Sequence, residues 1–359
     1  MRTPNALQAP AGFWLIGSGS RGLLLARRPF LGALVLAVLV FVAFDLSLVL
    51  GSAGLNPVNS VFALFGIGDS KTVFIVQKLR LFRAGAAVLT GAALGMAGCL
   101  LQTLARNRLA TPDTTGITAG ATAFAVWSVL SFSFGGTAGL PQFGPPVMSL
   151  LGAALAAGLA FALSGGAGAQ GFRFIVVGIA VGEVFSSLTN FFMARVSIDT
   201  ANQAYTWTVG SLNLRGGAPA WLLLFGLAIA VPISIAVARS LAVMRLDDRA
   251  AGSLGVNVPV VRVGAILLAV LLGALAISLA GPVGMVGLMA PEIARRICGP
   301  RDVPVLSSAF AGALVVLLAD LLGRTIFSPI EIPVGLVTSA VGAPYLLFIL
   351  LRSPSRANP

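Results

Sequence analysis

Ten long apolar segments restrict the fold of this chain more than any other feature. A helix needs about 20 residues to cross roughly 30 Å of hydrocarbon, with tolerance for tilt and buried breaks. The eighth segment is short and contains Pro291, so we expect a broken or tilted helix buried among its neighbours. The first apolar stretch, at about 21 residues, exceeds the 7–15 of a signal peptide, which indicates a retained helix. The predicted crossings are 29–50, 84–105, 114–134, 146–165, 173–195, 219–239, 260–280, 283–298, 304–323 and 333–351.

The composition excludes a water-soluble fold at this length. Of 359 residues, 57% are hydrophobic and only 9% are charged, whereas soluble domains carry roughly 25% charged residues. The absence of histidine and the presence of only two cysteines exclude histidine-based catalysis, histidine metal sites and cysteine-rich clusters. We therefore expect no metal site, and we expect Cys99 and Cys298 to be packing thiols without a disulfide.

The basic residues lie almost wholly between the apolar segments. With the amino terminus inside, 16 of the 23 fall on the cytoplasmic side and seven on the other, so both termini are predicted to be cytoplasmic. The net charge of +12 therefore indicates membrane topology, and no nucleic-acid partner is expected. The prediction is an all-α bundle of about ten helices, packed closely through small residues such as Gly91 and Gly95. It forms one transmembrane domain at 29–352, between a mobile tail at 1–28 and a short tail at 353–359.

The polar segment 240–259 is the candidate contact for a motor protein. The chain contains no Gly-x-x-x-x-Gly-Lys-Ser/Thr signature, so it has no ATPase site of this type. ATP-driven transport would need a partner chain that uses ATP and Mg²⁺, and we expect this chain to bind no cofactor itself. Asp247 and Asp248 suit the positive first turn of a short helix, and Gly255 suits its left-handed cap. An ordinary polar connector is the alternative.

Five stretches, in the same order along the chain, resemble the permease family of ABC importers for iron siderophores, haem and cobalamin. The family's coupling segment has an acid, an alanine three residues later and then Leu-Gly, a pattern that Asp248, Ala251, Leu254 and Gly255 fit. The other stretches are Arg80–Arg83 with Gly91–Gly98 and Gln102; Arg106–Pro112; Gly281–Pro291 with Arg295; and Ala319–Arg324 with Pro333–Gly342. Ferric-enterobactin-type subunits look most similar, through Gly210–Asn213, the paired Asp247 and Asp248, Ala280–Pro282 and Ala294–Arg296.

The resemblance implies a type II ABC importer permease that works as a dimer in the bacterial cytoplasmic membrane. The implied partners are a second permease, two ABC ATPase subunits, an extracytoplasmic siderophore-binding protein and the lipid bilayer. The second permease is expected to be a sister chain rather than an identical copy. The implied cargo is a ferric siderophore, with a catecholate of the enterobactin type favoured and cobalamin or haem as alternatives. The alternative from a different class of transport protein is an ion-coupled secondary transporter that uses Glu183.

The resemblance also assigns roles to residues at both mouths of the expected path. Arg80, Arg83 and Arg324 match positions that bind glutamates of the binding protein, and the spacing of Arg80 and Arg83 puts them on one helix face. Contacts with lipid headgroups are the alternative, and Arg324 could instead pair with Asp320 four residues earlier. Asn107 and Leu109 match the cytoplasmic gate, for which the alternative is a simple turn with Asp113 capping the next helix.

Glu183 lies near the middle of the fifth span, where an ionised acid costs roughly 2.5–3.5 kcal/mol. It should face the bundle interior or a water-filled cavity, and we expect it to line the path with Asn190 and Gln102. A buried, hydrogen-bonded or protonated carboxyl is the alternative. Glu292 is expected to pair with an arginine three or four residues on.

Three positions depart from the family pattern. Phe82 replaces the proline of Arg-x-Pro-Arg, Arg108 replaces the proline of Asn-Pro-Leu, and Glu292 replaces the histidine of Pro-His. Phe82 removes a rigid start to the second helix, and Arg108 adds charge beside the expected gate. The geometry of the gate is therefore the least transferable part of the resemblance.

Overall fold

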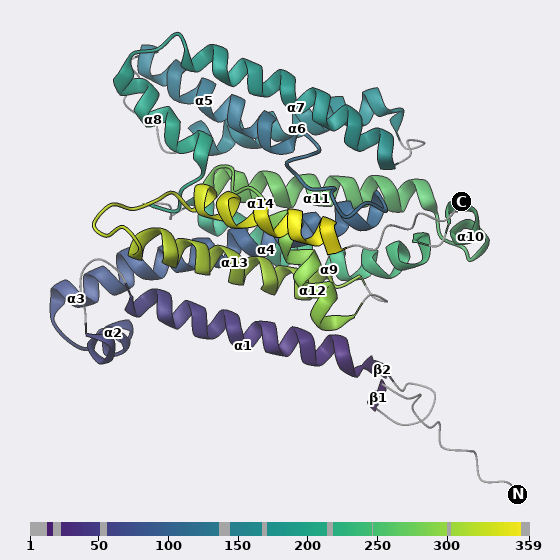
Figure 1. Ribbon diagram of the computed structural model, residues 1–359, viewed down its shortest axis with the longest axis horizontal. Helices are drawn as coiled ribbons and strands as arrows, with labels where there is room; N and C mark the ends of the chain where they lie inside the picture. The colour runs from purple at the N-terminus through teal and green to yellow at the C-terminus, as the bar shows by residue number, and fades with distance from the viewer. Residues whose placement is uncertain are drawn as a thin grey trace, which may run out of the picture.

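The computed structural model describes residues 13–16, 23–50, 56–135, 144–166, 171–213, 218–245, 247–299 and 303–352 (Figure 1). Its first elements are β1 (Phe13–Ile16), β2 (Leu23–Ala26), α1 (Arg27–Val49), α2 (Pro57–Leu64), α3 (Ser70–Phe74), the π-helix η2 (Ile75–Arg80), α4 (Leu81–Leu104) and α5 (Ile117–Gly135). The others are α6 (Gly144–Ser164), α7 (Gly171–Met193), α8 (Ile198–Val209), α9 (Ala218–Met244), α10 (Asp248–Ser253), α11 (Val258–Ala280), α12 (Val286–Cys298), α13 (Val305–Thr325) and α14 (Val334–Arg352).

Each of the ten predicted segments coincides with a helix to within a few residues. Seven helices of the described chain are long and apolar enough to cross a membrane, and shorter apolar helices lie at 117–131 and 334–348. α12 has 13 residues, contains Pro291 and is mostly buried, as predicted for the eighth segment. The all-α integral membrane fold is confirmed, and the count of ten crossings stays a prediction.

The chain near the amino terminus differs from the prediction. Two four-residue apolar runs pair as antiparallel strands, with Phe13 opposite Ala26 and Ile16 opposite Leu23. The sequence predicts only a mobile tail at 1–28, so the strand pair is a correction. Its physical reason is that short apolar runs separated by turn-forming residues favour a hairpin. α1 also begins inside the expected tail, at Arg27, and the mobility of the tail itself stays a prediction.

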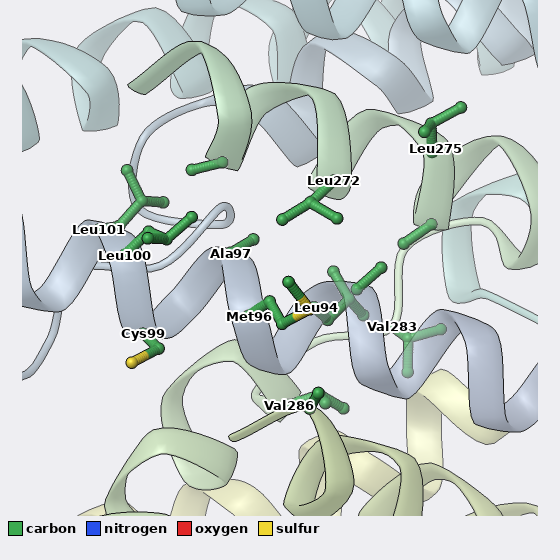
Figure 2. Packing of buried hydrophobic residues seen from close by; sticks show 14 of the residues in the cluster. Leu94, Met96, Ala97, Cys99, Leu100, Leu101, Leu272, Leu275, Val283 and Val286 are labelled. Atoms are coloured by element: carbon green, nitrogen blue, oxygen red, sulfur yellow. The ribbon is translucent and has the colours of Figure 1, made fainter. Parts of the chain in front are cut away.

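α4 lies at the centre of the bundle and contacts α1, α9, α11, α12 and α13. Figure 2 shows its side chains packed between Leu272 and Leu275 of α11 and Val286 of α12. A helix that is apolar around its whole circumference is expected to be buried on all sides. α4 is such a helix, and its residues 93–102 are all buried. Cys99, on α4, and Cys298, on α12, are both buried, as expected of packing thiols.

Glycines allow α4 to approach its neighbours closely. A Cβ at Gly91 would lie 2.3 Å from the carbonyl oxygen of Gly312, and one at Gly95 would lie 2.1 Å from that of Ser308. Both distances are far below contact, so α4 and α13 can pack this closely only with glycine at these positions. The close packing predicted from the small residues is confirmed.

A second close contact brings together three stretches that the family resemblance uses. Gly210 has a φ of +71°, and a Cβ there would lie 2.1 Å from the carbonyl oxygen of Pro282. A Cβ at Gly335 would lie 2.0 Å from the carbonyl oxygen of Val209. The ends of α8 and α11 and the start of α14 therefore meet through glycine backbone, which gives these motif residues a packing role.

The bundle has two polar ends, which we name by one arginine at each. The Arg83 end comprises the last turn of α1, η2, the start of α4 and the last turn of α13. The Arg106 end comprises α10 and the last turns of α4, α9 and α12. Figure 1 shows α2 and α3 at the first end and α10 at the other. A continuous helix of 35 residues, Ser70–Leu104, connects the two ends.

Candidate gate, coupling and docking sites

α10 has the local structure predicted for the segment 240–259. Asp247 is its N-cap, and the Asp247 carboxylate accepts the backbone N–H of Asp248 at 2.7 Å. Ala251 is fully buried, whereas Leu254 is 68% exposed. Gly255 follows the helix with a φ of +85°, the left-handed conformation expected of a glycine cap. The predicted short, capped helix is confirmed, and its contact with a motor stays a prediction.

Arg106 joins α10 to the gate loop, which we define as residues 105–116 between α4 and α5. Its Nε donates to the carbonyl oxygen of Met244 at 3.1 Å, and its Nη2 lies 2.5 Å from Oδ1 of Asp248. The other oxygen of Asp248 lies 2.5 Å from Nη2 of Arg262, at the start of α11. Burial acts to raise the pKa of Asp248, but Arg262 and Arg106 outweigh it and hold that pKa below its ordinary value. The coupling segment and the gate loop therefore share one ion-pair network.

The gate loop is fixed by side-chain contacts at several points. The Asn107 carbonyl Oδ1 accepts the backbone N–H of Leu109 at 2.9 Å, which makes a local turn, and Leu109 is 38% exposed. Asp113 accepts the hydroxyl of Thr118 at 2.7 Å, and it accepts the backbone N–H of Met285 at 3.4 Å. The turn proposed as the alternative is therefore present, while Asp113 also links α5 to the start of α12. The gate role of Asn107 and Leu109 stays a prediction.

Gln102 and Glu292 organise the arginines on α12. Gln102 is buried, accepts a hydrogen bond from Arg295 and donates to a backbone carbonyl at the start of α12 at 3.3 Å. Glu292 lies 3.6 Å from Arg295 and 3.2 Å from Arg296, which confirms the predicted pairing along the helix. Its Oε2 also lies 3.6 Å from Arg108 of the gate loop. Two of the three departures from the family pattern, Arg108 and Glu292, thus form an ion pair with each other.

Two arginines at the Arg83 end are buried against the last turn of α1. Arg80 is 6% exposed and donates to the carbonyl oxygens of Leu48 and Val49, both at 2.8 Å. Arg324 is 4% exposed and donates to the backbone carbonyl of Ser47 at 2.6 Å. Carbonyls in the last turn of a helix lack partners within it and attract cations. Arg80 and Arg324 therefore cap α1.

Arg83 lies in an ion-pair cluster that also includes Arg324. Its Nη2 lies 2.9 Å from Oδ1 of Asp320, and its Nη1 lies 2.8 Å from Oε2 of Glu331. The other oxygen of Asp320 lies 3.4 Å from Nε of Arg324, the pairing given as the alternative for Arg324. The Asp320 side chain is 1% exposed. One buried carboxylate is therefore shared by two arginines.

Arg80 and Arg83 reach neighbouring parts of one polar cluster. Arg80 donates to the last turn of α1, to which Arg324 also donates, and Arg83 pairs with Asp320, which also contacts Arg324. The predicted common face of Arg80 and Arg83 stays a prediction. All three arginines have partners within the chain, and their docking role stays a proposal. No spacing in the sequence points to Glu331, which reaches Arg83 from the loop after α13.

Glu183 and Asn190 lie on one exposed face of α7. Both side chains are exposed, as is Ser187 between them, and no ion pair or hydrogen bond to Glu183 is found within the described residues. Residues four and seven apart share a helix face. The alternative of a buried, hydrogen-bonded carboxyl does not hold for Glu183 in the single chain. Gln102 lies elsewhere, buried between α4 and α12, so the three predicted path residues do not come together.

These features define a class of protein: a multi-pass membrane permease with a capped polar helix at one end. The comparisons with known proteins agree, because residues 33–352 match the model of the FecCD transport family. The chain belongs to the FecCD transport family.

Relatives of the chain carry several cargo names. It is 36% identical to the iron(3+)-hydroxamate import system permease protein FhuG of Bacillus subtilis, over 91% of this chain and 98% of that one. It is 38% identical to the achromobactin transport system permease protein CbrC of Dickeya dadantii, over 89% and 90%. It is 32% identical to the ferric enterobactin transport system permease protein FepG of Escherichia coli, over 91% and 97%.

The fold is that of a solved ABC transporter chain. The similar structure is an inward-facing metal-chelate type ABC transporter, with a TM-score of 0.77 and 23% sequence identity. The match covers 90% of this chain and 99% of the other. The predicted fold is therefore confirmed as that of an ABC transporter chain.

Proposed function

We propose that this chain is the permease subunit of an ATP-driven importer of ferric siderophores, fed by an extracytoplasmic binding protein. The observation that carries the proposal is the family match over nearly the whole membrane domain, residues 33–352. The energy source would be a pair of ABC ATPase subunits on the cytoplasmic side. In this proposal the Arg106 end is cytoplasmic and the Arg83 end faces the binding protein.

The Arg106 network supports a route for mechanical coupling. Asp248 lies in the first turn of α10 and contacts Arg106, which directly precedes the gate residue Asn107. A force on α10 from a motor would therefore reach the gate loop through one ion pair and one peptide bond. Rigid-body movement of helices could then open the path on alternate sides.

The exposed face of α7 supports pairing with a second permease. Glu183 is exposed in the single chain, yet an ionised acid at mid-membrane costs roughly 2.5–3.5 kcal/mol against hydrocarbon. A second subunit across a water-filled path would remove this cost. We therefore place the path at the α7 face, between this chain and a sister permease.

The cargo assignment has two parts: the coarse assignment is an iron chelate, and the fine assignment is the type of chelate. Hydroxamate, achromobactin and enterobactin in the names of relatives at 32–38% identity support an iron-chelate cargo. The catecholate preference rests on the local resemblance described above, and relatives of other cargo types match at least as well. We propose a catecholate chelate as the finer assignment.

Reconstitution in vesicles tests both parts. The purified chain, with its co-purifying permease, ATPase and binding protein, would be supplied with ⁵⁵Fe as a catecholate, a hydroxamate or a citrate chelate. We expect ATP-dependent uptake of an iron chelate, and the catecholate should be taken up fastest. Faster uptake of another chelate would reject only the fine assignment.

Vesicles that contain this chain alone provide the control. An importer permease should transport nothing without the ATPase, with or without an ion gradient. Gradient-driven uptake by the chain alone would reject the proposal and favour the secondary transporter. In that case Glu183→Gln should abolish the uptake.

A further inference from the structure

A cavity of about 260 Å³ lies at the Arg106 end, between the gate loop and the ends of α4, α9 and α12. One water needs only about 10–15 Å³ on the same measure, so the cavity has room for a polyatomic ligand with its waters. None of the described lining residues is acidic. The lining consists of Gln102, Thr103, Arg106, Asn107, Arg108, Arg245, Arg295 and Pro304.

Four guanidinium groups converge on this cavity from three parts of the chain. Arg106 and Arg108 come from the gate loop, Arg245 from the end of α9 and Arg295 from α12. Such a concentration of one charge around a concave, partly enclosed space raises the local concentration of ions of the opposite sign. The cavity is therefore strongly attractive to an anion.

The ion pairs of the described residues leave the charge of Arg106, Arg108 and Arg295 incompletely balanced. Asp248 is divided between Arg106 and Arg262, and Glu292 is divided among Arg108, Arg295 and Arg296 at distances of 3.2–3.6 Å. Neither carboxylate lines the cavity. In the ion pairs of the described chain, two acids thus serve five arginines, which leaves an excess of positive charge.

Arg295 has an unused donor within this network. Within the described residues its Nε is buried and has no hydrogen-bond partner, although the same guanidinium binds Gln102 and Glu292. The contacts with protein therefore do not use the full donor capacity of this guanidinium, which also lines the cavity.

We propose that this cavity binds a phosphate-type oxyanion. Arginine forks match phosphate oxygens in pairs, and a tetrahedral anion can accept from guanidiniums that approach from several directions. The phosphate comes either from the headgroup of an anionic lipid or from free phosphate. A bound phosphate would contact arginines of the gate loop, α9 and α12 at once. It would therefore hold the gate loop in place against these two helices.

Anion binding by purified full-length protein tests the site without any need for transport. The key variant is Arg108→Gln with Arg245→Gln, which removes two cavity guanidiniums from different elements. Arg239→Gln with Arg249→Gln is the matched control, because it removes the same charge from exposed residues outside the cavity. Titration with inorganic phosphate in detergent measures one source. Native mass spectrometry from nanodiscs of phosphatidylglycerol or phosphatidylcholine measures the other.

The proposal expects phosphate or phosphatidylglycerol to bind the wild type and the control variant equally. The cavity variant should bind about tenfold more weakly or worse. Loss of phosphatidylglycerol alone would identify the lipid source, and loss of inorganic phosphate alone would identify the free anion. The site is rejected if neither ligand binds the wild type, or if the two double variants weaken binding equally. Matching thermal unfolding midpoints would show that both variants are folded.

Discussion

The two ends of the bundle use arginine in different ways. At the Arg83 end, the guanidiniums of Arg80 and Arg324 are buried against carbonyls of α1, and Arg83 and Arg324 share Asp320. At the Arg106 end, four arginines surround an open cavity. The difference shows that an arginine count locates a polar membrane end, whereas its partners decide whether that end is a structural tie or a ligand site.

The largest effect is expected from removing the buried acid of the Arg83 end. Asp320→Ala leaves two arginines without their shared carboxylate, and breaking a buried ion pair typically costs about 3–5 kcal/mol. We expect a loss of that size in the free energy of unfolding, measured by titration with a denaturing detergent. Asp199→Ala, an exposed acid in α8, is the control and should change stability by less than about 1 kcal/mol. Equal losses would mean that the Arg83 end is not held by Asp320.

The next largest effect on stability is expected from replacing a glycine of α4, in the helix that connects both ends. A Cβ at Gly98 would lie 1.9 Å from the carbonyl oxygen of Gly287, so Gly98→Ala must push α12 away at about 1–3 kcal/mol. Gly85→Ala on the same helix meets nothing within 4 Å. It should be neutral or stabilise by about 0.5–1 kcal/mol. Thermal unfolding of the two variants measures the difference, and similar midpoints would contradict the close approach of α4 and α12.

The Arg106 end should combine a small effect on stability with a large effect on coupling. Arg106 and Asp248 are both more than 40% exposed, and such ion pairs contribute about 0–1 kcal/mol. Arg106→Gln should therefore leave the unfolding midpoint nearly unchanged. Under the proposed function, chelate transported per ATP hydrolysed should fall at least about fivefold. Arg239→Gln, an exposed arginine of α9 outside the segment 240–259, is the control, and an unchanged ratio for Arg106→Gln would reject the coupling route.

The smallest effect is expected in how the stability contributed by Asp248 of the same network depends on pH. The folded-state pKa of Asp248 lies below its ordinary value of 3.8, because Arg262 and Arg106 favour the carboxylate. A lowered pKa contributes stability above the unfolded-state value, and that stability is lost as the pH falls through the folded-state value. The stability difference between wild type and Asp248→Asn should be constant from about pH 5 to 8 and shrink below about pH 4. If the stability difference between the two proteins increased at low pH, the pKa of Asp248 in the folded state would be raised rather than lowered.

Periodicity and local capping could be predicted from the sequence, because they depend on residues close together in the chain. The ten helices and the α10 cap from Asp247 to Gly255 are examples. Contacts between distant segments could not be predicted. Nothing in the sequence pairs Arg80 with the last turn of α1, and Arg108 and Glu292 read as two separate departures before the structure places them together.

The resemblance to a family located these segments but not the partners of their side chains. Gly210, Gly281 and Gly335 were predicted only as family motif residues, and the structure shows that they make close backbone contacts. Arg80 and Arg83 were predicted as contacts for a binding protein, and the structure gives each of them a partner within the chain. Motif residues therefore need coordinates before they are assigned to a partner.

The unbroken helix Ser70–Leu104 has a mechanical consequence. At 1.5 Å per residue its 35 residues span about 52 Å, well beyond the roughly 30 Å of hydrocarbon. It therefore behaves as a stiff rod that projects from the bilayer, with Arg83 about 20 Å along it from Ser70 and Gln102 in its last turn. A load applied at one of these two residues is felt at the other without passing through any hinge or loop. Arg83 and Gln102, which contact one polar end each, are for this reason carried on a single lever, and neither can shift along its axis alone.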